Sequence, residues 1–344
     1  MSLEPSRMAL EVAETGDRLA RQLAVNAPLI AETAALLKER DPRVVVTVAR
    51  GSSDHAALYL AYLIEIALGL PCASIGPSIA SLYHAPLRLD GALAVTISQS
   101  GRSPDIVALQ AAARRAGALT LALVNEVDSP VAAGAERVLP LHAGPEQSVA
   151  ATKSMIAALV AGAALVGRWA GDARISAAVD GLPALLGASA EPPPRPLIDR
   201  IAAAKSAFVL GRGATFAIAA EAALKLKETC AIHAEAFSSA EVLHGPAGVI
   251  TPGFLVIAFI PQDEARAGFS ETLARLAAMG AEILVVDAVA SAAKLALLAP
   301  AAGHHLLTPI VMLHRFYSLV EACARALGRD PDNPPHLRKV TETK

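Results

Sequence analysis

The hydrophobic and polar positions of this 344-residue chain form segments of two kinds that alternate along the sequence. Short runs rich in β-branched residues, such as residues 44–48 and 93–97, are typical of buried parallel strands. Between them lie longer Ala- and Leu-rich stretches with helical spacing, for example residues 56–67 and 106–116, and Gly and Ser mark the turns. The alternation predicts an α/β fold with doubly wound parallel sheets.

A proline-rich stretch divides the chain. Residues 190–197 read AEPPPRPL, and proline fixes φ and lacks an N–H donor. We therefore expect neither helix nor central strand here, but a linker over residues 189–197. It separates two domains, over residues 31–188 and 198–330, with an N-terminal helical segment at 1–30 and a polar tail at 331–344.

The two halves match each other at three places in the same order, at an offset of about 160 residues. The matching pairs are residues 46–65 with 208–228, 78–86 with 238–246, and 116–125 with 279–288. Three matches in register are hard to obtain from composition alone. The sequence therefore predicts two similar α/β units related by internal duplication.

Composition and charge exclude several classes of protein. Hydrophobic residues make up 54% of the chain and charged residues 18%, which excludes a disordered chain. The formal charge of −2 and the 3% of aromatic residues argue against a nucleic-acid partner. The N-terminus lacks a signal-peptide pattern, and the longest apolar run, residues 155–167, is too short to span a bilayer. We expect a soluble, cytoplasmic protein with no membrane partner.

The three cysteines, Cys72, Cys230 and Cys323, lie far apart and lack the spacing of a disulfide framework or a zinc site. The histidines also lack metal-ligand spacing. We therefore expect no metal and no cofactor.

Two Ser-rich turns are the clearest candidates for ligand binding. SQSGRSPD, residues 98–105, follows a predicted strand and offers the side chains of Ser98, Gln99, Ser100 and Ser103 at a helix N-terminus, where unpaired N–H groups can hold a phosphate. ARGSSDH, residues 49–55, follows another strand, so that Ser52 and Ser53 would face the same ligand. Ordinary helix capping explains both turns equally well. The equivalent of the first turn in the second half, residues 260–268, has no serine, which indicates one phosphate loop per chain.

A third candidate lies in residues 223–246. Lys225 and Glu228 are three residues apart and therefore share a helix face, where a carboxylate beside a lysine can move a proton. The same spacing is typical of a solvated, salt-bridged helix face, which the spacing alone favours. His233 suits a hydrogen-bonded interior position, whereas His244 lies on a loop before Gly-Pro.

Taken together, these motifs resemble the paired sugar isomerase (SIS) domain family, and in particular the isomerase half of glutamine–fructose-6-phosphate aminotransferase. The resemblance rests on RGSS, SQSGRS, GPEQSVAATKS, LGRGATFAIAAEAALKLKE, HAEAFSSAEVLHGP and the terminal LRKVT, and extends from about Met8 to Thr343. It implies two tandem, flavodoxin-like SIS domains that form a homodimer.

The resemblance also implies roles for individual residues. The two Ser-rich turns bind the phosphate, and Val149 contacts the sugar through its backbone. Glu228, supported by Lys225, moves a proton between C1 and C2. His244 of the partner subunit opens the sugar ring. Lys339 lies in a C-terminal tail that acts as a lid and contacts the open-chain sugar, either without a covalent bond or through a Schiff base. In the phosphate turn the family's usual acidic-Thr pair is replaced by Arg102 and Ser103, which adds a positive charge.

The resemblance does not include the glutaminase domain that generates ammonia in the aminotransferase. We therefore expect a glucosamine-6-phosphate deaminase that releases fructose 6-phosphate and ammonia. The alternatives within the enzyme class are a fructosamine-6-phosphate deglycase, a galactosamine/tagatose-phosphate deaminase, and the isomerase component of an aminotransferase with ammonia supplied in trans. Outside that class the alternative is a sugar-phosphate-sensing binding protein.

Overall fold

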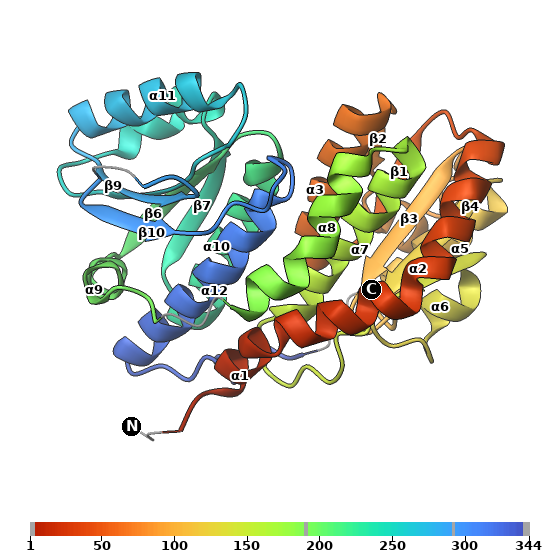
Figure 1. The fold of residues 1–344 in the computed structure, drawn as a ribbon, viewed down its shortest axis with the longest axis horizontal. Helices are drawn as coiled ribbons and strands as arrows, with labels where there is room; N and C mark the ends of the chain where they lie inside the picture. The colour runs from red at the N-terminus through yellow and green to blue at the C-terminus, as the bar shows by residue number, and fades with distance from the viewer. Residues whose placement is uncertain (1–3, 189–191, 291–292, 340–344) are drawn as a thin grey trace. The chain divides into compact units, whose positions relative to one another are not determined.

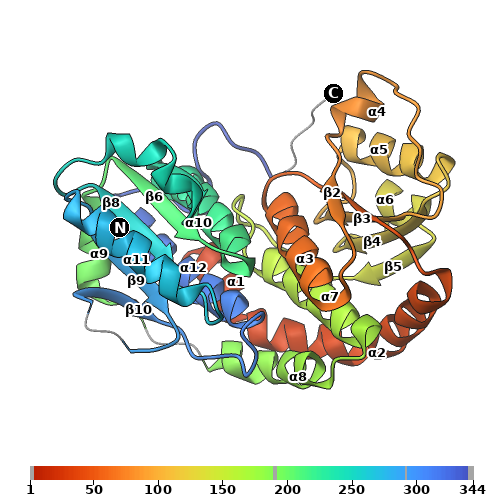
Figure 2. The ribbon, with the colours of Figure 1, turned by 90° about the horizontal axis from the view of Figure 1, so that it is seen from above.

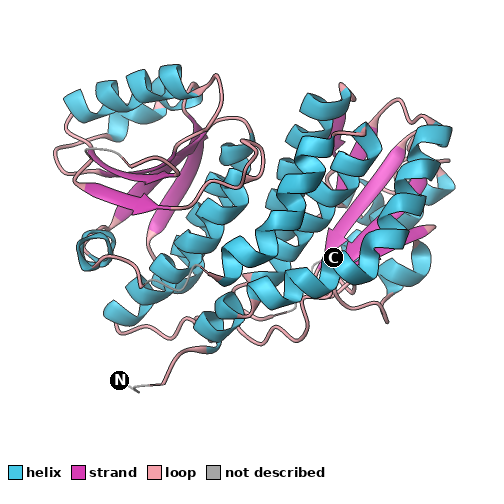
Figure 3. Cartoon of the chain, viewed as in Figure 1, coloured by secondary structure: helices cyan, strands magenta, loops and turns pink. Residues whose placement is uncertain are grey.

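The computed structural model describes residues 4–188, 192–290 and 293–339. The chain divides into two compact units, which are described separately. The first unit comprises Asp17–Glu146, Lys153–Pro183 and Arg338–Lys344, and the second comprises Met1–Gly16, Gln147–Thr152 and Ala184–Leu337. Figure 3 shows one magenta sheet in each unit, with cyan helices packed around it.

The first sheet has five parallel strands in the order β2-β1-β3-β4-β5 (Figure 1). The strands are β1 (Val45–Val48), β2 (Cys72–Ser74), β3 (Leu93–Ser98), β4 (Leu119–Val124) and β5 (Arg137–Pro140). The helices of this part of the chain are α2 (Thr15–Arg40), α3 (Ser52–Leu68), α4 (Ser78–Ser81), α5 (Pro104–Arg115), α6 (Pro130–Gly134), α7 (Lys153–Ala170) and α8 (Ala173–Gly187).

The second sheet is also all parallel, with the strand order β10-β9-β8-β6-β7. Taken from its other edge, this order is β7-β6-β8-β9-β10, which is the same topology as in the first sheet. Its strands are β6 (Ser206–Gly211), β7 (His233–Ser238), β8 (Leu255–Phe259), β9 (Glu282–Asp287) and β10 (Leu295–Leu298). The helices are α1 (Arg7–Ala13), α9 (Arg195–Ala202), α10 (Ala214–Cys230), the 3₁₀ turns η1 (Glu241–Leu243) and η2 (Pro246–Val249), α11 (Arg266–Ala278) and α12 (Thr308–Ala326). Two sheets of identical strand order confirm the predicted duplication.

Both faces of each sheet are covered, which explains why the central strands β1, β3 and β8 are buried along their whole length and mostly apolar. In the first unit, α5 and α6 pack Ile106, Leu109 and Val131 against one face, while α3 and α7 pack on the other (Figure 2). In the second unit, Phe269 of α11 packs on one face, and Phe316 of α12 meets Phe259 of β8 on the other. The core of each unit is therefore the three-layer sandwich that the sequence pattern predicts.

Helix α7 contains the apolar run noted in the sequence. Among the described residues it is the one helix long and apolar enough by composition to cross a membrane, yet 83% of that 18-residue window is buried inside the structure. This burial is typical of a core helix.

The proline-rich linker is shorter than the sequence predicts. Residues 189–191 lie outside the described residues, and α9 begins at Arg195, so the expectation that residues 195–197 are not helical is wrong. Pro196 occupies the first turn of α9, where a missing N–H costs nothing because that group has no partner within the helix. At the other end of the chain, residues 340–344 of the expected lid also lie outside the described residues.

Candidate active site

The turn after β3 folds around hydroxyl groups, as its sequence suggests. The Ser98 hydroxyl accepts a hydrogen bond from the Gly101 N–H at 2.9 Å, and Ser100 Oγ accepts one from the Arg102 N–H at 3.3 Å. Gly101 has φ +62°, which an L-residue adopts at a cost. Within the described residues, the Ser103 side chain makes no capping hydrogen bond to α5. The capping alternative therefore does not account for Ser103.

This turn forms one wall of a cavity of about 420 Å³ at the carboxyl ends of β1 and β3. The predicted residues that line it are Ser53, Ser98, Gln99, Ser100, Ser103 and Lys339. Two residues of the same turns, Ser52 and Arg102, are not among its lining residues; the Arg102 guanidinium donates to the Asp128 carbonyl instead. The cavity lies at the sheet edge where open α/β proteins bind ligands.

Arg50 also lines this cavity, at the end of β1. Its Nε donates to Asp105 Oδ2 at 2.9 Å, and its Nη2 lies 2.9 Å from the same oxygen. Asp105 is in the first turn of α5 and only 1% exposed, whereas the Arg50 side chain is 54% exposed. A buried carboxylate thus fixes the direction of a cation at the cavity.

Lys339 reaches the cavity from the C-terminal tail and pairs with a second buried carboxylate. Its Nζ lies 3.0 Å from Glu146 Oε2, and Glu146 also accepts hydrogen bonds from the Ser154 backbone N–H at 3.0 Å and hydroxyl at 2.6 Å. Burial alone would raise the pKa of Glu146, but the Lys339 charge and the Ser154 hydrogen bonds outweigh burial and lower this pKa. The tail is therefore anchored at Lys339 by an ionised glutamate.

The second unit holds Lys225 and Glu228 on one face of α10, and they form an ion pair. The Lys225 Nζ also lies 3.3 Å from Glu221 Oε1, which accepts a hydrogen bond from the Tyr317 hydroxyl at 3.0 Å. Lys225 and Glu221 are fully buried, whereas 22% of the Glu228 side chain is exposed. The array leaves the Glu228 carboxyl side chain partly exposed and keeps its counter-ion Lys225, together with Glu221, inside the protein.

The solvated helix face that the spacing alone favours is wrong, because Lys225 has no exposed surface. Burial by itself would lower the pKa of Lys225, but the charges of Glu221 and Glu228 raise this pKa above its ordinary value. Lys225 is therefore a buried ammonium that holds the Glu228 carboxylate in place, an arrangement suited to a positioned acid–base group.

The remaining predicted residues also lie in the second unit. His244 is exposed in the turn after η1, and His233 is exposed on β7 rather than buried inside the protein. The Val149 N–H donates to the Asp332 carbonyl at 3.0 Å, so a backbone contact from Val149 would use its carbonyl oxygen. Its loop is held by the buried Glu11 carboxylate, which accepts hydrogen bonds from the Gln147 and Ser148 N–H groups.

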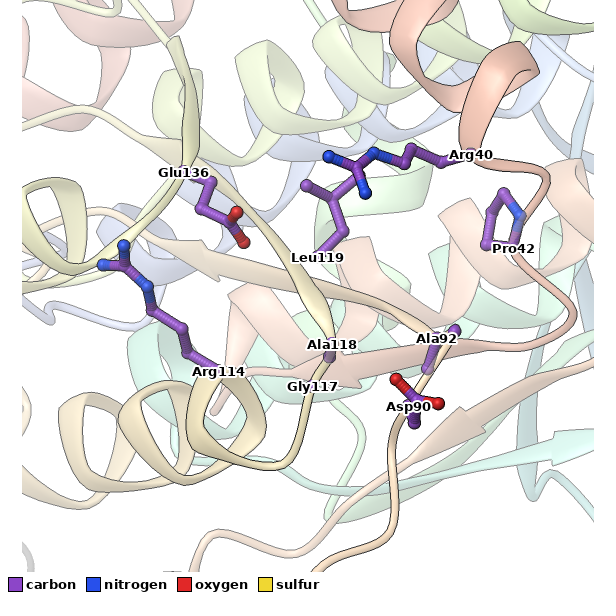
Figure 4. A pocket seen from close by; sticks show the side chains of 10 residues that line it. Arg40, Pro42, Asp90, Ala92, Arg114, Gly117, Ala118, Leu119 and Glu136 are labelled. Carbon is purple, nitrogen blue, oxygen red and sulfur yellow. The ribbon is translucent and has the colours of Figure 1, made fainter.

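A second hollow, also of about 420 Å³, lies at the opposite edge of the first sheet (Figure 4). Arg40, Asp90, Arg114 and Glu136 surround it, and in the figure the Arg40, Asp90 and Glu136 side chains point into it. All four are exposed, and no residue singled out from the sequence lines the hollow. Because this edge carries the amino ends of the strands, the candidate site is the cavity at the other edge.

Over the described ranges no group of three His, Cys, Asp or Glu side chains is arranged to hold a metal ion. The three cysteines are free thiols, and burial raises the pKa of Cys230 to about 11 and that of Cys72 to about 12. These thiols are therefore poor nucleophiles.

Comparison with known proteins places the chain in a family. The sequence profile of the SIS domain matches two segments, residues 38–168 and 200–325. The chain belongs to the SIS domain family. Each matched segment contains one of the two parallel sheets, so the duplication is a pair of SIS domains.

Three relatives illustrate the similarity. A glutamine–fructose-6-phosphate aminotransferase (isomerizing) from Symbiobacterium thermophilum is 35% identical over 316 residues, 86% of this chain and 51% of that protein. A crystal structure from Silicibacter pomeroyi, provisionally named a phosphosugar isomerase, is 46% identical with a TM-score of 0.90, covering 95% of this chain and 100% of that one. The C-terminal domain of the Francisella tularensis aminotransferase is 25% identical with a TM-score of 0.83, covering 96% and 99%. The SIS pair spans about half the length of the curated relatives it matches.

Sequence reasoning missed the carboxylates that hold the cations of this SIS pair, and it missed Arg50. Glu221 lies four residues before Lys225, so helical spacing was a usable signal. Arg-Gly recurs in both halves, at residues 50–51 and 212–213, which marked Arg50 for attention. The pairing of Glu146 with Lys339, 193 residues away, left no local signal.

The phosphate turn depends on Gly101. A Cβ added at this position would lie 2.2 Å from Ser129 Oγ and 2.7 Å from Ser129 Cβ, in addition to the cost of its positive φ. We expect G101A to lower the free energy of unfolding by about 1–3 kcal/mol more than G91A does. Gly91 is the matched control, because its φ is +71° and a Cβ there would meet none of the described atoms within 4 Å. Urea unfolding of both variants measures the difference, and equal losses would contradict the account.

The anchoring of Lys339 predicts a pH dependence of stability. The Glu146 pKa is lowered in the folded chain, so its contribution is complete above the ordinary value of 4.5 and is lost as the pH falls through the folded value. E146Q should therefore cost about 1–3 kcal/mol near pH 7, and the gap from wild type should narrow with acidification. Thermal unfolding from pH 7 to about pH 3 tests this, because the gap should narrow only below about pH 4.5. The exposed Glu271 changed to Gln is the control. A gap that does not change with pH would show that Glu146 is not held ionised.

Proposed function

We propose that this SIS pair is a phosphosugar isomerase that acts on amino-sugar phosphates. It converts glucosamine 6-phosphate and water to fructose 6-phosphate and ammonia. The observation that carries the proposal is the partly exposed Glu228 side chain, whose carboxylate is ion-paired with the buried Lys225; Lys225 in turn is held by the buried Glu221. Membership of the SIS family and 46% identity over 95% of the chain to a protein provisionally named a phosphosugar isomerase support it.

The first step is substrate binding. The sugar phosphate is held by the Ser and Gln side chains of the turn after β3, by Ser53 and by the N–H groups that begin α3 and α5. Hydroxyl and N–H donors at the amino ends of two helices suit a dianion.

Proton transfer follows ring opening. His244, contributed by the partner subunit of a homodimer, moves the proton that converts the ring to the open chain. Glu228 then takes the proton from C2 and delivers it to C1, while one proton of the C2 amine passes to the C1 oxygen. The C1 aldehyde thereby becomes a hydroxymethyl group, and the C2 amine becomes an imine. Water adds to C2, ammonia leaves, and the C2 ketone of fructose 6-phosphate remains, so that atoms and charge balance.

Lys339 contacts the open chain as an ammonium. Its partner Glu146 has a lowered pKa, so the pair is ionic, which favours a hydrogen-bonding and electrostatic role over Schiff-base formation. The reaction as proposed uses only sugar phosphate, water and these side chains. Aminotransferase chemistry with ammonia from another source runs through the same steps in reverse.

The direct test is release of both products from glucosamine 6-phosphate by the purified protein. We expect wild type to release ammonia and fructose 6-phosphate in equal amounts, and E228Q to lose about 10²–10⁴-fold in kcat with an intact fold. The matched control is E271Q on α11, which should retain the wild-type rate. Turnover by E228Q at the wild-type rate would refute the role of Glu228.

The same assay separates the rival substrates and directions. Fructosamine 6-phosphate and galactosamine 6-phosphate replace glucosamine 6-phosphate in parallel reactions, and fructose 6-phosphate with ammonium tests the reverse direction. Faster turnover of either alternative sugar would replace the substrate in the proposal. Binding of all these sugars without turnover would refute the proposed enzyme activity and favour a sugar-phosphate-sensing binding protein.

The origin of His244 is tested by mixing inactive subunits. If His244 acts across a dimer interface, one site of an E228Q/H244N mixed dimer contains both intact residues, and activity returns. We expect about a quarter of wild-type activity after random reassortment of equal amounts, because half of the dimers are mixed and each has one intact site. Absence of recovery in demonstrably mixed dimers would place His244 and Glu228 in the same subunit.

A further inference from the structure

Arg50 is a cation to which neither the family resemblance nor the proposed chemistry assigns a role. It lines the cavity together with Ser98, Ser100 and Ser103, and Lys339 is the other charged residue among the described lining residues. Lys339 enters from the tail, whereas Arg50 belongs to the sheet edge itself, two residues after β1. Of the two cations, Arg50 is therefore placed by the rigid part of the unit.

The geometry of the Arg50 ion pair leaves the guanidinium able to bind an anion. Both contacts converge on one oxygen of Asp105, from Nε and from Nη2. A guanidinium carries five N–H groups in a planar fork, so a second, bidentate contact on its other edge is available to an oxyanion. The Arg50 side chain is 54% exposed, whereas its partner Asp105 is almost fully buried, so the accessible part of the ion pair is the arginine.

The second SIS domain provides an internal comparison. Arg212 occupies the position equivalent to Arg50, before Gly213, but its Nη1 donates to the Ser238 hydroxyl at 3.0 Å rather than to a buried carboxylate. The turn after β8 also has no serine. At this position of the duplicated sheet, an arginine held by a buried carboxylate therefore occurs in the domain that has the hydroxyl-rich turn, which links Arg50 to the ligand of that turn.

We propose that Arg50 binds the phosphoryl group of the substrate by a charge-assisted contact, with Asp105 as the positioning residue that sets its direction. The ligand class is a phosphate monoester dianion, and Arg50 makes the site prefer phosphorylated over unphosphorylated sugars. The inference rests on the proposed function in one respect, that the ligand of this turn is a sugar phosphate.

Inorganic phosphate is the probe, because its binding does not require turnover. By calorimetry we expect R50A to weaken phosphate binding about 10- to 100-fold, whereas R102A stays within about threefold of wild type. Arg102 is the matched control, a cation of the neighbouring turn whose side chain is bound to the Asp128 carbonyl and does not line the cavity. Unchanged phosphate binding by folded R50A would overturn the proposal.

R50A leaves a buried Asp105 without its counter-ion and is at risk of misfolding. The double variant R50M/D105N removes both charges and keeps the side-chain volumes, and it should show the same loss of phosphate affinity. D105N alone should raise KM for the sugar phosphate several-fold with kcat within about threefold of wild type, because the arginine remains but loses its direction. A fall in kcat at unchanged KM would assign Asp105 another role.

These measurements separate this inference from the proposed function. Weaker phosphate binding by R50A in a protein that turns over none of the sugar phosphates would support Arg50 and refute the isomerase. Turnover of glucosamine 6-phosphate by wild type, with R50A binding phosphate as tightly, would support the isomerase and refute Arg50.

Discussion

Buried carboxylates that hold cations are the interaction on which the candidate chemistry of this protein depends. Asp105 fixes Arg50, Glu146 fixes Lys339, and Glu221 fixes Lys225. Burying an ion is costly unless it is paired and hydrogen-bonded, and each of these carboxylates has a cation within 3.3 Å. Replacing a whole buried ion pair by apolar residues often changes stability little, whereas removing only one partner is costly. The role of these pairs is to orient the cations, because an ion pair with a buried carboxylate restricts the conformations of the lysine or arginine side chain.

The parallel sheet determines where these pairs lie. In a parallel sheet all carboxyl ends meet at one edge, so the turns after β1 and β3 are neighbours although their serines are about 45 residues apart in the sequence. Both SIS domains have this edge, but the side chains near it differ between them. One domain has the hydroxyl-rich turn with Arg50 and Lys339, and the other has Lys225 and Glu228 on α10.

The extent of sequence prediction follows from how local each feature is. Periodicity and turn residues predicted the parallel sheets and the duplication, and motif spacing placed Lys225 beside Glu228. The solvated interpretation of that pair was wrong because burial of α10 depends on its packing against α12, which spacing cannot show. Asp105 and Glu146 were missed for a related reason. Each depends on a partner distant in the sequence, so local pattern carried no information about it. The helical start of α9 was missed for a local reason, because the linker interpretation did not allow for a proline in the first helical turn.

The most direct test of the account follows the hydrogen on C2 of the sugar. Glucosamine 6-phosphate carrying deuterium at C2 is incubated with the protein, and the carbon-bound deuterium is followed by nuclear magnetic resonance. The account predicts that deuterium leaves C2 as ammonia is released and appears at C1 of fructose 6-phosphate or in water. Ammonia release with the deuterium still on C2 of the product sugar would contradict it, because the amine would then leave without the proton transfer assigned to Glu228.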